Sequence, residues 1–210
     1  MKYVVFGDSK KGTAHRENED TILIDGTRNL YAVADGLTIP SGGREASNRS
    51  ITYLKAAFDG KLKKAVEITN EKINKDRLMH DVGYTTITAA KITDDKLELA
   101  NVGDSPAFLV RDGKIKMLTV LDSFFDMSLT QAIGKPEINV HVSMETLKEG
   151  DYLILASDGI TKVLTEDELV DIVKKYADPK KIVQETILAA IEEPKSYDDD
   201  KSMIVIYMRE

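Results

Sequence analysis

The sequence contains no cysteine, no tryptophan and only three histidines among its 210 residues. The absence of cysteine excludes disulfide bonds, thiolate catalysis and zinc sites built on cysteine. The three histidines, His15, His80 and His141, do not predict a histidine-rich metal site. A metal bound by this chain would therefore need mainly oxygen ligands.

A signal peptide, a long apolar run and an excess of positive charge are also missing. Residues 1–6 are too short and too soon interrupted to form a signal peptide or a membrane-spanning helix, so we expect a soluble cytoplasmic protein, by default a monomer. The formal net charge is −7, which makes the nucleic-acid backbone a poor partner. An acidic balance suits divalent cations, although many soluble proteins are acidic for solubility alone.

The hydrophobic content of 42% is enough for a sizeable core, and no repeat or linker divides residues 1–210, so we expect one domain. Apolar alternation and turn signals such as Asp112-Gly113 predict strands. Helical periodicity, a capping box at Thr165 and the pair Asp178-Pro179 predict helices. The predicted strands cover residues 2–7, 21–24, 29–34, 86–92, 96–102, 106–111, 114–118, 139–143, 152–156 and 203–208, and the helices cover 46–58, 62–73, 166–176 and 179–191.

This order of elements predicts an α+β fold. Many short strands joined by hairpins, together with two pairs of antiparallel helices, indicate sheets packed face to face with helices on the outside. The apolar faces of the first two predicted helices are sufficiently explained by packing on the core.

Two apolar strands end in an aspartate followed by a glycine. Residues 30–36 have the sequence Leu-Tyr-Ala-Val-Ala-Asp-Gly, and residues 152–159 have the sequence Tyr-Leu-Ile-Leu-Ala-Ser-Asp-Gly. An ionised aspartate at the end of a strand buried on both faces needs a partner or a metal, whereas a single Asp-Gly commonly begins a turn. Two copies of the pattern favour a polar site shared by both strand ends.

Five aspartates at strand ends or tight turns are candidate metal ligands. Carboxylates suit Mg²⁺, Mn²⁺ or Ca²⁺, and an EF-hand is excluded because its acids must lie within one loop. Dispersed acids that converge in space indicate a multi-metal hydrolytic centre, in which two ions roughly 3.5–4 Å apart share a water. The candidates are Asp20, Asp35, Asp104, Asp158 and Asp199.

Six segments follow the order of motifs in one protein family. The sequence resembles the metal-dependent protein phosphatases (PPM), the type 2C Ser/Thr phosphatases, particularly their small bacterial members, over nearly its whole length. Residues 129–134, Leu-Thr-Gln-Ala-Ile-Gly, are also similar to the family's Leu-Thr-Arg-Ala-Leu-Gly. The six segments are Arg16-Glu17-Asn18-Glu19-Asp20, Tyr31-Ala32-Val33-Ala34-Asp35-Gly36, Tyr84-Thr85-Thr86, Ala100-Asn101-Val102-Gly103-Asp104-Ser105, Leu155-Ala156-Ser157-Asp158-Gly159 and Asp199-Asp200-Lys201-Ser202.

The resemblance implies two packed antiparallel sheets flanked by helix pairs, which agrees with the fold expected from the residues. It also implies an enzyme that hydrolyses phosphoserine or phosphothreonine by direct attack of metal-activated water, without a phospho-enzyme. Its cofactors would be Mn²⁺ or Mg²⁺, as two or three ions. Its substrate would be a phosphorylated protein, in opposition to a Ser/Thr kinase.

The resemblance assigns a role to each acidic position. Asp35 is implied to bridge two metals while the carbonyl of Gly36 contacts one of them, and Asp158 and Asp199 are implied to hold one metal directly. Asp35 and Asp158 are therefore the expected catalytic acids, together with Arg16. The remaining implied ligands act through metal-bound waters or hold a third, weaker ion: Glu19, Asp20 and Asp104.

The phosphate-binding arginine of the family stands five residues before the aspartate of its Asn-Glu-Asp. His15 occupies that position here, and Arg16 lies one residue closer. Because a guanidinium is the better fork for phosphate, we expect Arg16 to bind the substrate phosphate. His15 either shares this contact or is a solvated loop residue.

The displaced arginine, a missing histidine and a short flap support an alternative function, a non-catalytic phosphoprotein-binding module or pseudophosphatase. No histidine follows Asp35-Gly36, where many members carry a general acid, a group typically worth about 10²–10⁴-fold in rate. Asp200 replaces the usual asparagine, and its added charge would either tighten ion binding or raise a neighbouring pKa. The segment between Leu118 and Leu129 is shorter than the family's flap, and we expect its Phe124-Phe125 pair to be buried rather than to contact a partner.

Overall fold

The computed structural model describes residues 2–124, 128–193 and 197–209. Within these ranges the strands form two five-stranded antiparallel sheets. The first sheet has the order β1 (Lys2–Lys10), β10 (Lys201–Arg209), β9 (Tyr152–Ala156), β6 (Ala107–Arg111), β7 (Lys114–Met117). The second has the order β2 (Asp20–Asp25), β3 (Leu30–Asp35), β4 (Ile87–Thr93), β5 (Lys96–Val102), β8 (His141–Thr146).

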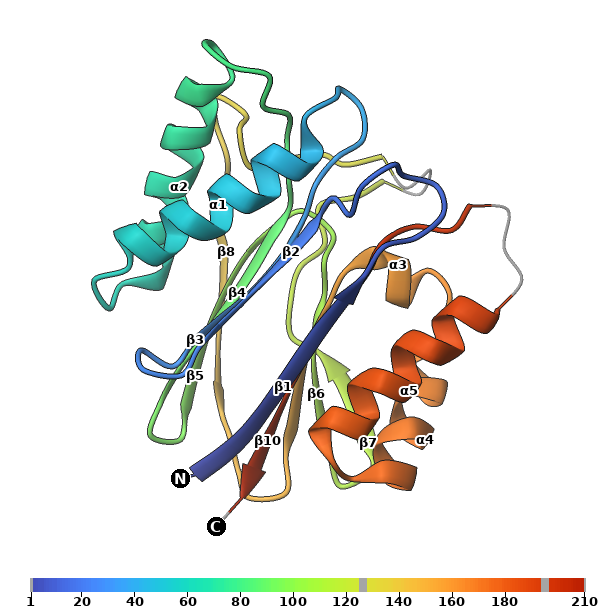
Figure 1. The fold of residues 1–210 in the computed structure, drawn as a ribbon. Coiled ribbons are helices and arrows are strands. Elements are labelled where there is room, and N and C mark those ends of the chain that lie inside the picture. The colour runs from blue at the N-terminus through green and yellow to red at the C-terminus, as the bar shows by residue number, and fades with distance from the viewer. Residues whose placement is uncertain (1, 125–127, 194–196, 210) are drawn as a thin grey trace.

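The two sheets pack face to face, and helices cover both outer faces (Figure 1). The helices α1 (Gly43–Ala57) and α2 (Leu62–Asp76) cover the second sheet. The first sheet is covered by α4 (Glu166–Tyr176) and α5 (Pro179–Glu192), with the short α3 (Asp158–Thr161) beside them. The predicted α+β sandwich with a helix pair on each side is therefore confirmed.

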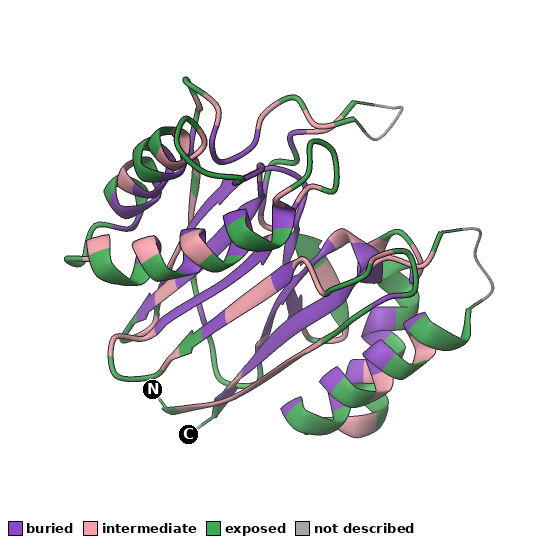
Figure 2. Ribbon diagram, turned by 45° about the horizontal axis from the view of Figure 1, so that its top comes forward, coloured by how far each residue is buried: buried purple, intermediate pink, exposed green. Residues whose placement is uncertain are grey.

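Alternation along the central strands builds three layers of core. In β9, Leu153 and Leu155 point between the sheets, whereas Ile154 and Ala156 point toward the helices. The strand β3 divides its residues in the same way between the inter-sheet layer and the layer under α1 and α2. Because both faces of these strands are buried (Figure 2), their sequences are continuously apolar rather than alternating.

The boundaries of several elements differ from the sequence prediction. The strand β1 continues to Lys10, where a polar loop was expected, because it pairs with β10 along its whole length up to Lys201. The helix α3 was not predicted, since four residues are too few to show a period. The hairpin between β6 and β7 was predicted correctly: Asp112 and Gly113 both have positive φ, 51° and 72°, as a two-residue hairpin turn requires.

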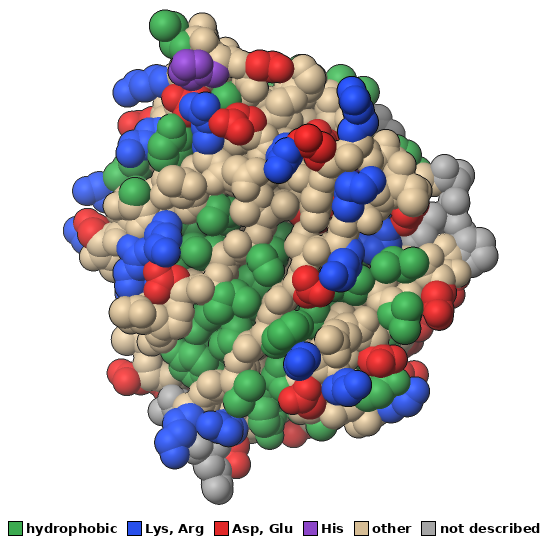
Figure 3. Space-filling model, in the orientation of Figure 1, with side chains coloured by type: hydrophobic (Ala, Val, Ile, Leu, Met, Phe, Trp, Pro, Cys, Tyr) green, Lys and Arg blue, Asp and Glu red, His purple; other side chains and the backbone are tan. Residues whose placement is uncertain are grey.

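One edge of the sandwich is less fully covered than the rest. The strands β1 and β2 are edge strands of different sheets and lie next to each other. Figure 3 shows hydrophobic side chains along this face between the two helix pairs. The residues of β1 are accordingly intermediate in burial between the exposed Lys2 and Lys10.

The expectation of a buried Phe124-Phe125 pair is wrong for Phe124, whose residue surface is 63% exposed. The segment that carries it is held at Asp122, which is buried and accepts a hydrogen bond from the backbone N–H of Gly103. Phe125 lies outside the described residues. Among the helices of the described ranges, none has the length and apolar character needed to cross a membrane.

Replacement of Thr165 by alanine should destabilise the protein by about 1 kcal/mol, because the capping box at the start of α4 would be lost. Thr52→Ala is the matched control: Thr52 is exposed within α1 and donates to the carbonyl of Asn48, a bond that adds little to helix stability. Urea unfolding measures both. Equal stability of the two variants would contradict the role of the cap.

Candidate metal centre and phosphate site

Strand pairing brings the acidic segments to one end of the sandwich. In the second sheet Asp20 begins β2 and Asp35 ends β3, and the antiparallel register places the two residues opposite each other. In the first sheet Ala156, the last residue of β9, pairs with Met203 of β10, so the segments flanking these residues meet at the same edge. Asp158 and Asp199 belong to these two flanking segments.

A turn between the sheets adds the next carboxylate. The chain passes from β5 in the second sheet to β6 in the first through Gly103, Asp104 and Ser105. Gly103 has φ of 101°, and a Cβ there would lie 2.7 Å from the side chain of Thr86. Ser105 is fixed by its hydroxyl, which lies 2.7 Å from the Thr86 hydroxyl. Four predicted acids thereby line one cavity of 210 Å³: Asp35, Asp104, Asp158 and Asp199.

The acids raise one another's pKa. Burial, and then the charges of Asp20, Asp158, Asp199 and Asp104, raise the pKa of Asp35 well above its ordinary value. Burial also raises the pKa of Asp20 to about 7 and that of Asp104 to about 6, with Asp158 contributing to both. The protein therefore holds these carboxylates in positions where their negative charge is unfavourable without a cation nearby.

Asp20 lies behind the cavity and is held by serines of the opposite sheet. The hydroxyl of Ser157 donates to Asp20 Oδ2 at 2.8 Å and in turn accepts the backbone N–H of Ser202 at 2.9 Å. The backbone N–H of Asp20 donates to the side chain of Asn18 at 2.9 Å. These bonds fix the Asp20 carboxylate between the two sheets, where only 8% of the surface of the residue is exposed.

Two glycines permit close backbone contact at the site. A Cβ at Gly36 would lie 2.3 Å from the carbonyl oxygen of Gly43 at the start of α1. A Cβ at Gly159 would lie 1.9 Å from the carbonyl oxygen of Asp200. The glycine after each aspartate is thus required by packing, because any larger residue would push the adjacent segment away from its aspartate.

Besides burial, the charge of Asp200 raises the pKa of Asp20 and of Asp199, and its carboxylate is also held by hydrogen bonds. Its carboxylate is buried and accepts three hydrogen bonds: from the N–H of Gly12 at 2.7 Å, from the N–H of Glu19 at 2.7 Å and from His15 Nδ1 at 3.0 Å. A carboxylate accepts at both oxygens, which an asparagine cannot do. This chain has aspartate at position 200 where the family usually has asparagine. Asp200 therefore ties the loop before β2 to the start of β10.

Both ring nitrogens of His15 have hydrogen-bond partners. Nδ1 donates to Asp200 Oδ2 at 3.0 Å, and Nε2 lies 2.9 Å from the hydroxyl of Thr38, which donates to Glu19 at 2.8 Å. Burial alone would lower the pKa of His15, but the hydrogen bond to Asp200 and the charges of Asp199, Asp200 and Glu19 raise it. His15 thus lies at the edge of the acidic cavity, where the surrounding carboxylates favour its protonated form, and it is not a solvated loop residue.

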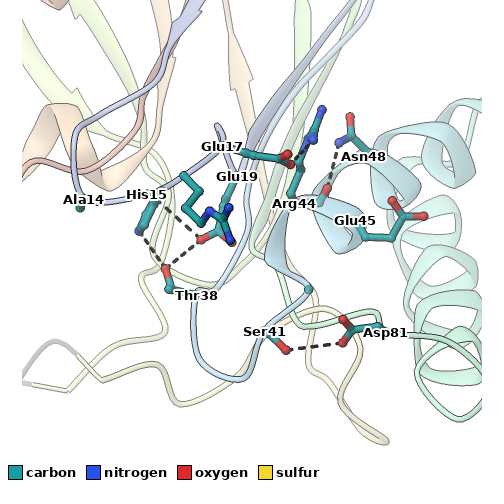
Figure 4. Close-up of a pocket in the computed structure, with 12 residues that line it drawn as sticks. Ala14, His15, Glu17, Glu19, Thr38, Ser41, Arg44, Glu45, Asn48 and Asp81 are labelled. Carbon is teal, nitrogen blue, oxygen red and sulfur yellow. Dashed lines mark hydrogen bonds and ion pairs between the residues drawn. The ribbon is translucent and has the colours of Figure 1, made fainter.

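Arg16 lies in a larger cavity next to the acidic one. This outer cavity measures 1140 Å³ and is bounded by the loop before β2, by Thr38 and by the first turn of α1 (Figure 4). Its second arginine, Arg44, forms an ion pair with Glu17. Within the described ranges the structure gives Arg16 no carboxylate partner, so its guanidinium is available to a ligand.

The residues at the inner cavity fit a divalent metal. Asp158 Oδ1 is buried and has no hydrogen-bond partner among the described residues. Oxygen ligands from aspartates at the ends of rigid strands are the donor set that Mn²⁺ and Mg²⁺ accept. Several negative charges in one buried cavity require positive charge for their stability.

Three residues of the site were not predicted from the sequence: Thr38, Lys162 and Tyr197. The hydroxyl of Tyr197 lies 2.7 Å from His15 Nε2, and Lys162 pairs with Asp158. The spacing of Asp158 and Lys162 is the one signal that was available, because residues four apart share a face of a helix. The contacts of Thr38 and Tyr197 join segments too distant in sequence to show a pattern.

Asp200→Ala should leave the N–H groups of Gly12 and Glu19 without acceptors, at a cost of about 1–3 kcal/mol for each buried group. We expect lower stability in urea unfolding and faster hydrogen exchange at these two amides. Asp59→Ala is a control, since the exposed Asp59 accepts one long bond of 3.2 Å from the N–H of Lys61. Unchanged exchange at Gly12 and Glu19 would show that Asp200 does not hold the loop.

A family profile and the sequences of known relatives identify similar proteins. The profile described as "Stage II sporulation protein E (SpoIIE)" matches residues 45–209. The chain is 30% identical over 182 residues to "Probable protein phosphatase 2C 17" of Arabidopsis thaliana, covering 70% of this chain and 64% of the relative. It is 30% identical over 181 residues to "Protein phosphatase PhpP" of Streptococcus pneumoniae, covering 70% of this chain and 73% of the relative.

The matched part spans less than two thirds of some relatives, 64% of the first plant protein and 56% of "Probable protein phosphatase 2C 9" from the same plant.

Solved structures agree with this chain over the full fold. The PPM Ser-Thr phosphatase MsPP of Mycobacterium smegmatis superposes with a TM-score of 0.85 at 27% identity, covering 98% of both chains. PstP of Mycobacterium tuberculosis gives a TM-score of 0.89 at 22% identity, covering 99% of both. This chain belongs to the family of metal-dependent type 2C protein phosphatases, the PPM family.

Proposed function

We propose that this chain is a metal-dependent protein serine/threonine phosphatase and that residues 1–210 act as a single catalytic domain. The observation that carries the proposal is the convergence of aspartates from five separate segments at one end of the sandwich. The names of its relatives, which include serine/threonine phosphatases from bacteria, support the same activity. The reaction is hydrolysis of a phosphoserine or phosphothreonine ester by water.

The inner cavity is the proposed metal centre. Asp35, Asp158, Asp199 and the carbonyl of Gly36 would hold Mn²⁺ or Mg²⁺ directly, as the positions of these residues around one cavity support. When bound, divalent ions lower the pKa of water and neutralise charge on phosphate oxygens. PstP has been crystallised with two manganese ions. The outer ligands in this proposal are Glu19 and Asp20, which would act through metal-bound waters, whereas Asp104 faces the position of a third, weaker ion.

Arg16 and His15 are the proposed phosphate contacts. Arg16 lies at the outer cavity and can bind two phosphate oxygens through its planar fork. His15 borders both the outer and the inner cavity, and the carboxylates around it raise its pKa and so favour the positively charged form. The substrate phosphate therefore has a cationic path from the wide outer cavity to the acids.

The leaving alkoxide receives its proton without a dedicated histidine. No histidine follows Asp35-Gly36, and the loop from Leu37 to Gly43 contributes Thr38 to the cavity instead. We propose that solvent supplies this proton, and we therefore expect slower turnover than in family members that carry a general acid.

The substrate in this proposal is a phosphorylated protein that a Ser/Thr kinase produces, which the names of the serine/threonine phosphatases among its relatives support. We propose that the chain acts as a monomer in the cytoplasm. Its net charge of −7 argues against nucleic acid as a partner.

Asp35→Asn should abolish metal-dependent phosphate release from a phosphothreonine peptide. Asparagine has nearly the same shape, but it removes the charge that faces the other acids, so we expect a fall of at least roughly 10²–10³-fold in kcat. The assay is run with Mn²⁺ and with a chelator. Asp59→Asn, far from the cavity and exposed, is the control and should retain wild-type turnover.

Two results would argue against the phosphatase. Turnover that persists in the chelator would exclude the metal centre. No turnover by wild type with any divalent ion, combined with retention of the phosphopeptide by wild type and by Asp158→Ala, would favour the non-catalytic binding module instead.

Arg16→Ala should raise KM for the phosphopeptide and leave kcat within a few fold, since Arg16 binds the phosphate from outside the acidic cavity. A charge-assisted hydrogen bond contributes about 1.5–3 kcal/mol, which corresponds to roughly 10–100-fold in kcat/KM. Arg28→Ala, whose guanidinium pairs with Asp25, is the control. A loss confined to kcat would instead assign Arg16 to the chemical step.

A further inference from the structure

Lys162 places an ammonium group among the acids of the inner cavity. The helix α3 begins at Asp158, and the backbone N–H of Lys162 donates to the carbonyl of Asp158 at 2.8 Å. This single turn of helix returns the Lys162 side chain over Asp158, where its Nζ forms an ion pair with Oδ2. The pairing follows from the local sequence and needs no distant segment.

The ammonium faces more than one acid. Lys162 lines the cavity of 210 Å³ together with Asp35, Asp104 and Asp158, and it also borders a neighbouring cavity of 240 Å³. Burial by itself would lower the pKa of Lys162, but the charges of Asp158, Asp104 and Asp35 outweigh it and raise the pKa. In turn, Lys162 opposes the rise in the pKa of Asp104.

The two oxygens of Asp158 have different surroundings. Oδ2 is taken by Lys162, whereas Oδ1 is buried and has no hydrogen-bond partner among the described residues. One carboxylate can thus serve a fixed ammonium with one oxygen and a metal ion with the other. A divalent ion between Asp104 and Asp158 would have to share the place of the ammonium and would be repelled by it.

We propose that Lys162 is a built-in cation that occupies the position beside Asp104 and Asp158, so that the chain binds two divalent ions rather than three. The inference rests on the proposed function, because it concerns the ions of the same centre. It makes Asp104 a partner of Lys162 rather than a ligand of an additional metal.

The test is the number of Mn²⁺ ions bound per chain at saturation, measured by equilibrium dialysis and elemental analysis from micromolar to millimolar metal. We expect two ions in the wild type and three in Lys162→Asp, which replaces the ammonium with a third carboxylate beside Asp104 and Asp158. Asp104→Asn should return Lys162→Asp to two ions and leave the wild type at two. Circular dichroism confirms that each variant is folded.

A second variant tests the role of the ammonium without adding the carboxylate that Lys162→Asp introduces. Lys162→Gln removes the charge alone and should admit a third, weaker ion in the millimolar range. Lys63→Gln is the matched control, because Lys63 also pairs with a carboxylate four residues away, Glu67, but lies on α2 outside the cavity. The control should bind two ions.

The outcomes separate this inference from the proposed function. Three ions in the wild type, or two ions in both Lys162 variants, would overturn the role of Lys162 and leave the phosphatase intact. A wild-type chain that binds no Mn²⁺ would overturn the metal centre and this inference together.

Discussion

Repulsion among carboxylates is the constraint on which the rest of this structure depends. Asp20 and Asp35 lie at the ends of β2 and β3, and Asp158 begins α3. Asp20 and Asp158 raise the pKa of Asp35, and Asp158 raises that of Asp20, because the three meet at one buried end of the sandwich. Left to itself, a chain would separate these charges or protonate them. The two sheets keep these acids together. Antiparallel pairing fixes Asp20 opposite Asp35, and it places the segment after β9 next to the segment before β10. The carboxylates, held close together at a cost in free energy, can therefore bind a divalent cation.

The supporting contacts explain why the scaffold does not relax. Gly36 and Gly159 lie so close to backbone of neighbouring segments that no side chain fits there. Ser157 links Asp20 to β10, and Asp200 links the loop before β2 to the same strand. Each contact joins one sheet or loop to another, so a displacement of one acid requires movement of several backbone segments. Rigid positions of this kind are what a metal centre needs for defined geometry.

The sequence was sufficient where the determining forces are local or repeat regularly. Continuous apolar runs predicted β3 and β9, the Asp112-Gly113 signal predicted a hairpin, and the capping box predicted the start of α4. The fold class followed from the order of these elements. Most of the interactions that were missed are long-range, as between Asp200 and Gly12 and between Tyr197 and His15; the pairing of Lys162 with Asp158 is a local one. Phe124 was misassigned because hydrophobicity alone does not show whether a short loop can reach the core.

The separation of the two cavities has a consequence for the order of binding. Before ions bind, the inner cavity presents aspartates to an incoming phosphate, and Lys162 is already paired with Asp158. Arg16 in the outer cavity carries too little positive charge to reverse this field. In the proposed phosphatase, a phosphate dianion would therefore be repelled from the metal-free chain and attracted once divalent ions offset the charge of the acids. The ions proposed for the chemistry would then also control access of the substrate, so that substrate binding would follow metal binding.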